Sequence, residues 1–103
     1  MIEILATESP EALRLQAYGH ATGKAEVCAG VSALLYALRG WVSERERREG
    51  WPADASEARI GKGSATIRMP RTEETELAFG LVLHGLLLVH AAAPDAVSVS
   101  YGE

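Results

Sequence analysis

One short stretch of the sequence brings together a histidine, a loop and the only cysteine in the chain. His20 follows a glycine, and Cys28 comes eight positions later, where an apolar pattern of helical spacing begins. The first turn of a helix carries partial positive charge and free N–H groups, which favour a thiolate and can stabilise an oxyanion. The spacing therefore predicts a nucleophile, Cys28, and a general base, His20. Taken alone, these residues also fit a small buried cysteine and a turn histidine, which are commoner.

The segment around these two residues resembles the signature of the ribosomal-processing (Prp) cysteine proteases. Gly19-His20-Ala21 is similar to the family's Gly-His-Ala, and residues 28–34 (Cys-Ala-Gly-Val-Ser-Ala-Leu) are similar to its Cys-Ala-Ala/Gly-x-Ser-Ala segment. The resemblance implies a homodimeric cysteine endopeptidase with His20 as general base and Cys28 as nucleophile. It also implies a substrate pocket that includes Gly19, Ala29 and Ser32.

Members of this family remove a short N-terminal extension from large-subunit ribosomal protein twenty-seven, and phage relatives are associated with capsid or scaffold proteins. They cut beside an aromatic residue, under a mobile loop between the histidine and the cysteine. Here the step from His20 to Cys28 is shorter, and Ala25 stands where the family usually has an aspartate. Either Glu26 takes over the orienting role of that acid or the role is absent. The sequence thus predicts an endopeptidase, with a weak or inactive dimeric binding module as the alternative.

Other residues that could do chemistry have structural interpretations. His84 and His90 lie six positions apart, which does not place them on one helix face, so packing or interface roles are expected rather than metal binding. Residues 61–64 (Gly-Lys-Gly-Ser) lack the spacing of a phosphate loop and predict a hairpin turn. Tyr18 is a candidate to line the site, and an interface position fits it equally well. Neither a metal nor a cofactor is expected.

The elements that position these residues follow from periodicity. Alternation predicts strands at 2–4 and 13–20, a hairpin of 58–60 with 64–70, and a last strand at 97–101. Helical spacing predicts helices from 27 to 49 and, after a cap at Thr72, to about 92. The expected fold is α+β in the order ββαββαβ, an antiparallel sheet with two helices packed on one face. One domain over residues 1–103 is predicted.

Charge and composition restrict the partners. The net charge is −4, which argues against binding nucleic acid through bulk charge. The apolar run 77–93 is shorter than the roughly 20 residues that a membrane span needs, so a buried helix is predicted and no membrane partner. A single cysteine and an N-terminus without a signal-peptide pattern indicate a cytoplasmic protein. The nearly uncharged surfaces of both helices favour a homodimer, with a peptide or protein as the other partner.

Overall fold

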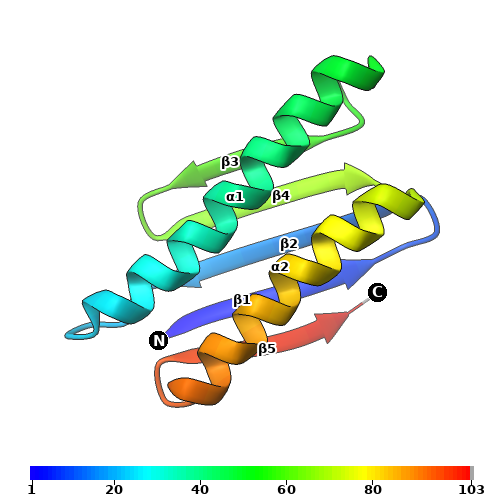
Figure 1. Cartoon of the computed structure of the whole chain (residues 1–103). Helices are drawn as coiled ribbons and strands as arrows, with labels where there is room; N and C mark the ends of the chain where they lie inside the picture. The colour runs from blue at the N-terminus through cyan, green and yellow to red at the C-terminus, as the bar shows by residue number, and fades with distance from the viewer. Residues whose placement is uncertain (103) are drawn as a thin grey trace.

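The computed structural model describes residues 1–102, so Glu103, the last residue of the predicted domain, lies outside the described part. The predicted order of elements is confirmed, with boundaries within about three residues for most elements (Figure 1). The elements are β1 (Ile2–Glu8), β2 (Ala12–Gly19), α1 (Ala25–Glu49), β3 (Glu57–Gly61), β4 (Ser64–Pro70), α2 (Glu73–Ala92) and β5 (Val97–Gly102).

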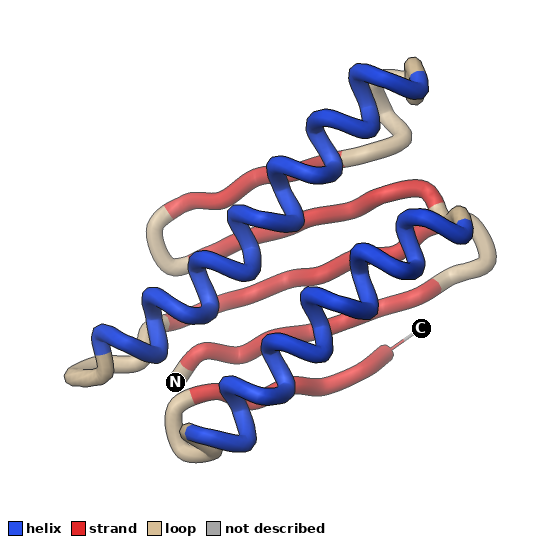
Figure 2. Tube along the Cα trace, in the orientation of Figure 1, coloured by secondary structure: helices blue, strands red, loops and turns tan. Residues whose placement is uncertain are grey.

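The five strands form one sheet in the order β3-β4-β2-β1-β5, and both helices lie on the same face of it (Figure 2). β1 pairs antiparallel with β2, β2 with β4, and β4 with β3. The antiparallel sheet that was predicted is correct for these pairs and wrong for one: β5 runs parallel to β1, so the sheet is mixed. The reason is that α2 carries the chain back along the sheet before β5 begins, so β5 runs in the same direction as β4 and β1.

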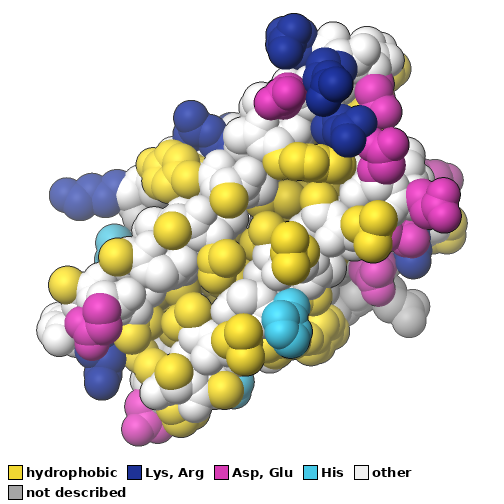
Figure 3. Space-filling view, viewed as in Figure 1, with side chains coloured by type: hydrophobic (Ala, Val, Ile, Leu, Met, Phe, Trp, Pro, Cys, Tyr) yellow, Lys and Arg dark blue, Asp and Glu magenta, His cyan; other side chains and the backbone are white. Residues whose placement is uncertain are grey.

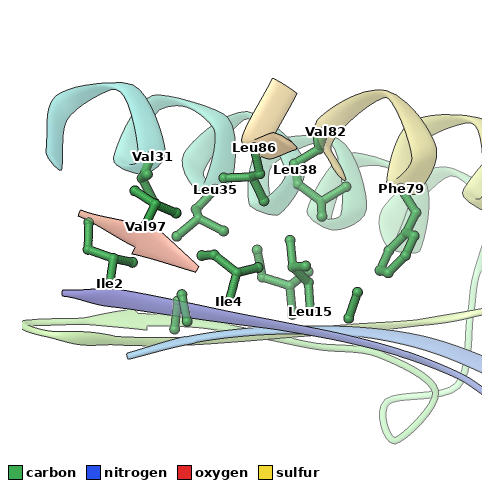
Figure 4. Close-up of a cluster of buried hydrophobic side chains, with 14 of the residues drawn as sticks. Ile2, Ile4, Leu15, Val31, Leu35, Leu38, Phe79, Val82, Leu86 and Val97 are labelled. Atoms are coloured by element: carbon green, nitrogen blue, oxygen red, sulfur yellow. The ribbon is translucent and has the colours of Figure 1, made fainter. Parts of the chain in front are cut away.

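The hydrophobic core fills the layer between the sheet and the two helices (Figure 4). Alternate residues of each central strand point into this layer, because successive side chains of a strand face opposite ways. From the sheet the fully buried side chains include Ile4, Leu13, Leu15, Ile67 and Met69, and from the helices Leu38, Val42 and Leu86. The same alternation leaves Arg14, Gln16 and Tyr18 on the other face of the sheet, which no element covers in residues 1–102.

Helix ends follow local chemistry. α1 ends at Gly50, which adopts φ +65° and donates its N–H to the carbonyl of Glu46, as a left-handed C-cap does. α2 begins with a capping box, in which the Thr72 hydroxyl accepts the Thr75 N–H and the Thr75 hydroxyl accepts the Thr72 N–H. The cap that was predicted at Thr72 is therefore confirmed.

The prediction that α2 is a buried helix is right for only one of its faces. Phe79, Val82 and Leu86 pack on the sheet, but Leu77 and Leu81 on the outer face are 74% and 73% exposed. The sheet covers one side of the helix and no described element covers the other. By length and composition α1 and α2 could each cross a membrane, a test that helices packed in a core also pass.

Candidate active site

The end of β2, the first three turns of α1 and the β3–β4 turn line one open cavity of about 230 Å³. Both His20 and Cys28 line it. They reach it from different elements, His20 from the residue after β2 and Cys28 from the helix. The topology thus brings the two predicted residues to the same hollow, at the end of the sheet where the chain passes from β2 into α1.

Backbone contacts fix the position of His20. Gly19, the residue before it, has φ +98°, and a Cβ there would lie 2.3 Å from the carbonyl oxygen of Met1. Only glycine fits this combination of close approach and left-handed backbone. The N–H of Gly19 donates to the carbonyl of Gly63 at 3.0 Å, and the His20 carbonyl accepts a hydrogen bond from the N-terminal ammonium group at 2.8 Å. The peptide is therefore held on both sides of His20, while the imidazole itself is exposed.

Cys28 is the fourth residue of α1 and is half-buried. Its Sγ donates to the carbonyl oxygen of Ala21 at 3.7 Å, and its amide donates to the carbonyl of Lys24 at 3.2 Å. The amide of Cys28 is thus already used within the helix. The first amides of a helix have no intrahelical acceptor, but Ala25 and Glu26 do not line this cavity.

The loop between the two residues is short and tied down. It consists of residues 21–24, and Ala21 is only 5% exposed. The Lys24 N–H donates to the carbonyl of Ala21 at 3.0 Å, and the thiol of Cys28 donates to the same oxygen. Within residues 1–102, no hydrogen bond joins the His20 ring to the Cys28 sulfur. His20 and Cys28 therefore share a cavity, with the thiol of Cys28 hydrogen-bonded to a backbone carbonyl.

Of the other residues predicted for the site, some line the cavity and some do not. Gly19 and Ser32 line the cavity, and so does Tyr18. Ala29 is exposed and does not line it. Glu26 lines a separate hollow between the start of α1 and the end of α2, so its carboxylate is not part of the cavity wall near His20. Among the described residues, no carboxylate lines the cavity at all.

Sequence reasoning missed the contribution of the β3–β4 turn. Residues 61–64 form the predicted hairpin turn, and they also make one wall of the cavity. Lys62 in this turn is the one Lys, Arg, Asp or Glu side chain that lines the cavity within residues 1–102, and Tyr36 of α1 was missed as well. The turn lies there because β4 pairs with β2, with Ser64 opposite Tyr18. This pairing joins residues that are far apart in the sequence, so the local sequence pattern does not reveal it.

The remaining histidines lie elsewhere. His90 Nδ1 is 2.5 Å from the carbonyl oxygen of Val97, which confirms the prediction of a packing role for this residue. His84 is exposed on α2. In the part of the chain that the structure describes, no group of three His, Cys, Asp or Glu residues is arranged to hold a metal ion.

Comparisons with known proteins give no match in sequence and clear matches in structure. No family model matches the chain, and no curated protein matches it significantly. The essential ribosomal processing protease Prp from Staphylococcus aureus, solved with a covalently linked product peptide, superposes with a TM-score of 0.73 at 21% identity, covering 99% of this chain and 100% of that one. Its complex with a substrate peptide gives 0.72 at 20% identity, with the same coverage.

A Streptococcus mutans protein, SMU.848, is also similar, with a TM-score of 0.75 at 22% identity, and the match covers 98% of this chain and 96% of that one. At such identities a structural likeness establishes the fold but does not establish the chemistry. This chain therefore has the fold of the ribosomal processing protease Prp over nearly its whole length.

Proposed function

We propose that this protein is a cysteine endopeptidase that removes a short N-terminal extension from another protein, with Cys28 as nucleophile and His20 as general base. The substrate would be a ribosomal protein or a phage capsid or scaffold protein, and the site of action the cytoplasm. One observation carries the proposal: the only cysteine and the histidine eight residues before it line the same cavity. The neighbours of the same fold that were solved with substrate and product peptides support a peptide as ligand.

The chemistry follows from the groups in the cavity. His20 takes the thiol proton of Cys28, and the thiolate attacks the carbonyl carbon of the scissile peptide bond. The imidazolium then gives its proton to the leaving amine, and the thioester forms on Cys28 as the C–N bond breaks. Water, deprotonated by His20, hydrolyses the thioester and restores the thiol. For the first step the thiol must exchange its bond to the Ala21 carbonyl for one to the imidazole.

Alkylation of Cys28 tests the proposal without knowledge of the substrate. Iodoacetamide should modify the wild-type thiol near neutral pH about tenfold or more faster than a free thiol, since the thiolate is the reactive form. The His20→Ala variant should lose this advantage. His84→Ala is the matched control, because His84 is an exposed histidine that does not line the cavity, and its rate should equal that of the wild type. The Cys28→Ser variant should bind a cleavable peptide and leave it intact.

A second function, a dimeric binding module with little or no activity, is favoured by specific observations. Position 25 holds an alanine, the Glu26 carboxylate faces another hollow, and the thiol of Cys28 is bonded to a backbone carbonyl. Alkylation at the rate of a free thiol in both the wild type and the His20→Ala variant would support this function and refute the endopeptidase.

We also propose that the protein acts as a homodimer formed through the outer faces of its helices. Apolar side chains gather across both helices, whereas charged side chains lie mainly toward their ends (Figure 3). Leu77, Leu81 and Leu88 are 74%, 73% and 59% exposed, and they line one side of α2 at helical spacing. Between the helices lies an apolar groove of about 410 Å³ that includes Ala37 and Trp41.

A second copy of the chain is the occupant that this surface fits. A two-fold contact would place the leucines of one α2 against those of the other, and the nearly uncharged face would meet itself without repulsion between like charges. Opposite charges already pair at one end of the groove, where Arg45 lies 2.6 Å from Glu74. Sedimentation equilibrium should give a dimer for the wild type and a monomer for Leu81→Arg. A monomeric wild type at tens of micromolar would refute the dimer.

A further inference from the structure

The β3–β4 turn lies directly against the imidazole of His20. Gly63 in this turn has φ +78°, and a Cβ built on it would lie 2.8 Å from His20 Nε2 and 3.4 Å from Cε1. Real Cβ atoms essentially never approach another atom so closely, so the ring occupies space that only a glycine leaves free. A side chain at position 63 would therefore overlap the edge of the imidazole that carries Nε2, and the ring would have to move.

The turn is held in register with the strand that leads to His20. The carbonyl of Gly63 accepts the N–H of Gly19 at 3.0 Å, next to the pairing of Ser64 with Tyr18. Backbone hydrogen bonds of the sheet therefore fix the distance between the turn and the backbone at Gly19, next to His20. The backbone of the turn is thus fixed relative to the backbone that leads into His20.

No hydrogen bond among the described residues orients the ring. Within residues 1–102, the His20 imidazole makes no hydrogen bond, and no carboxylate lines the cavity. An exposed imidazole without a partner would sample several rotamers, and a general base works only when its nitrogen stays within reach of the proton. The space left free at Gly63 is what allows the ring to take its present position.

We propose that Gly63 is the positioning residue of His20. Its missing side chain leaves the space that the imidazole occupies in the cavity shared with Cys28, at a site that has no orienting carboxylate. This inference rests on the proposed function, since it concerns the base of that reaction. Gly63 itself touches no substrate in this scheme and acts only through the ring.

Two glycine variants separate this role from a structural one. Gly63→Ala places a methyl group against Nε2, whereas Gly50→Ala introduces alanine at a similar backbone angle, φ +65°, where nothing lies within 4 Å. Both variants strain a left-handed residue, so both should lower the melting temperature. Only Gly63→Ala should lose the acceleration of Cys28 alkylation that depends on His20, falling at least tenfold toward the rate of His20→Ala, while Gly50→Ala keeps the wild-type rate across the pH range.

A measurement on the unaltered protein covers the case in which Gly63→Ala fails to fold. Nuclear Overhauser cross-peaks should connect the Gly63 α-protons to the ring protons of His20, and their absence would overturn the inference. A Gly63→Ala variant that keeps full His20-dependent alkylation would also overturn it, and would leave the endopeptidase proposal intact. A wild type whose alkylation does not depend on His20 would instead refute the proposed function, and this inference with it.

Discussion

The buried hydroxyl of Thr75 should be one of the most costly single groups to remove from this protein. Thr75 is fully buried in the first turn of α2. Its Oγ1 donates to the carbonyl of Pro70 at 2.7 Å and accepts the N–H of Thr72 at 2.7 Å. Thr75→Val keeps the shape of the side chain and leaves both of these backbone groups without their partner.

The loss of unfolding free energy depends on the two backbone groups left unpaired, the Pro70 carbonyl and the Thr72 N–H. An unpaired buried donor or acceptor costs about 1–3 kcal/mol, and Thr72 can recover part of this from water because it is exposed. We expect Thr75→Val to lower the free energy of unfolding by about 2–4 kcal/mol. That is a large part of the roughly 5–15 kcal/mol of a typical domain and corresponds to a fall in melting temperature on the order of 10 °C.

Urea unfolding followed by circular dichroism measures this effect, with Thr75→Ser as the matched control. Serine keeps the hydroxyl and loses one methyl group, so it should cost only about 1 kcal/mol. The slope of the unfolding free energy with urea should stay the same in all three proteins, because the exposed surface does not change. A valine variant as stable as the serine variant would show that the hydroxyl does not tie β4 to α2 energetically.

Two further predictions follow from the helices and the cavity. Gly80→Ala should stabilise the protein by about 1 kcal/mol, because nothing lies within 4 Å of the new methyl group. Gly85→Ala should destabilise it by roughly 1 kcal/mol, because its Cβ would lie 2.8 Å from Leu34 Cδ2. Equal shifts of the two variants in urea midpoint would contradict this prediction. Lys62→Glu should slow alkylation of Cys28 by anionic iodoacetate about fivefold more than alkylation by neutral iodoacetamide, a difference on the order of 1 kcal/mol; equal slowing of both reagents would show that the Lys62 charge does not act on the anionic reagent.

Most of the fold could be predicted because its signals are local. The alternation in 64–70, the helical spacing from 27 onward and the cap at Thr72 each depend on neighbours in the sequence, and the structure confirms all three. The direction of β5 was predicted wrongly because strand pairing depends on which strands meet in space. The uncharged surface of α2 was recognised, but the prediction of a buried helix was wrong for its outer face, since an apolar sequence does not reveal whether its cover comes from the same chain.

The candidate site likewise contains residues that could be predicted from the sequence and residues that could not. His20 and Cys28 could be found because they lie eight residues apart on either side of one loop. Gly63 and Lys62 could not be found, since they reach the cavity only through the pairing of β4 with β2. The location of the Glu26 carboxylate depends on the phase of α1, which a sequence defines only to within a residue or two. Residues recruited by long-range pairing are the ones that required the structure.

The short, pinned connection between β2 and α1 has a consequence for how a substrate gains access. The five residues 20–24 span at most about 18 Å when fully extended. The carbonyl oxygen of the buried Ala21 also accepts hydrogen bonds from Lys24 and Cys28. Such a segment is too short and too well hydrogen-bonded to fold over a bound polypeptide. If the proposed endopeptidase activity holds, a substrate strand would enter from the side of the cavity, and neither its binding nor the release of products would wait for this segment to open.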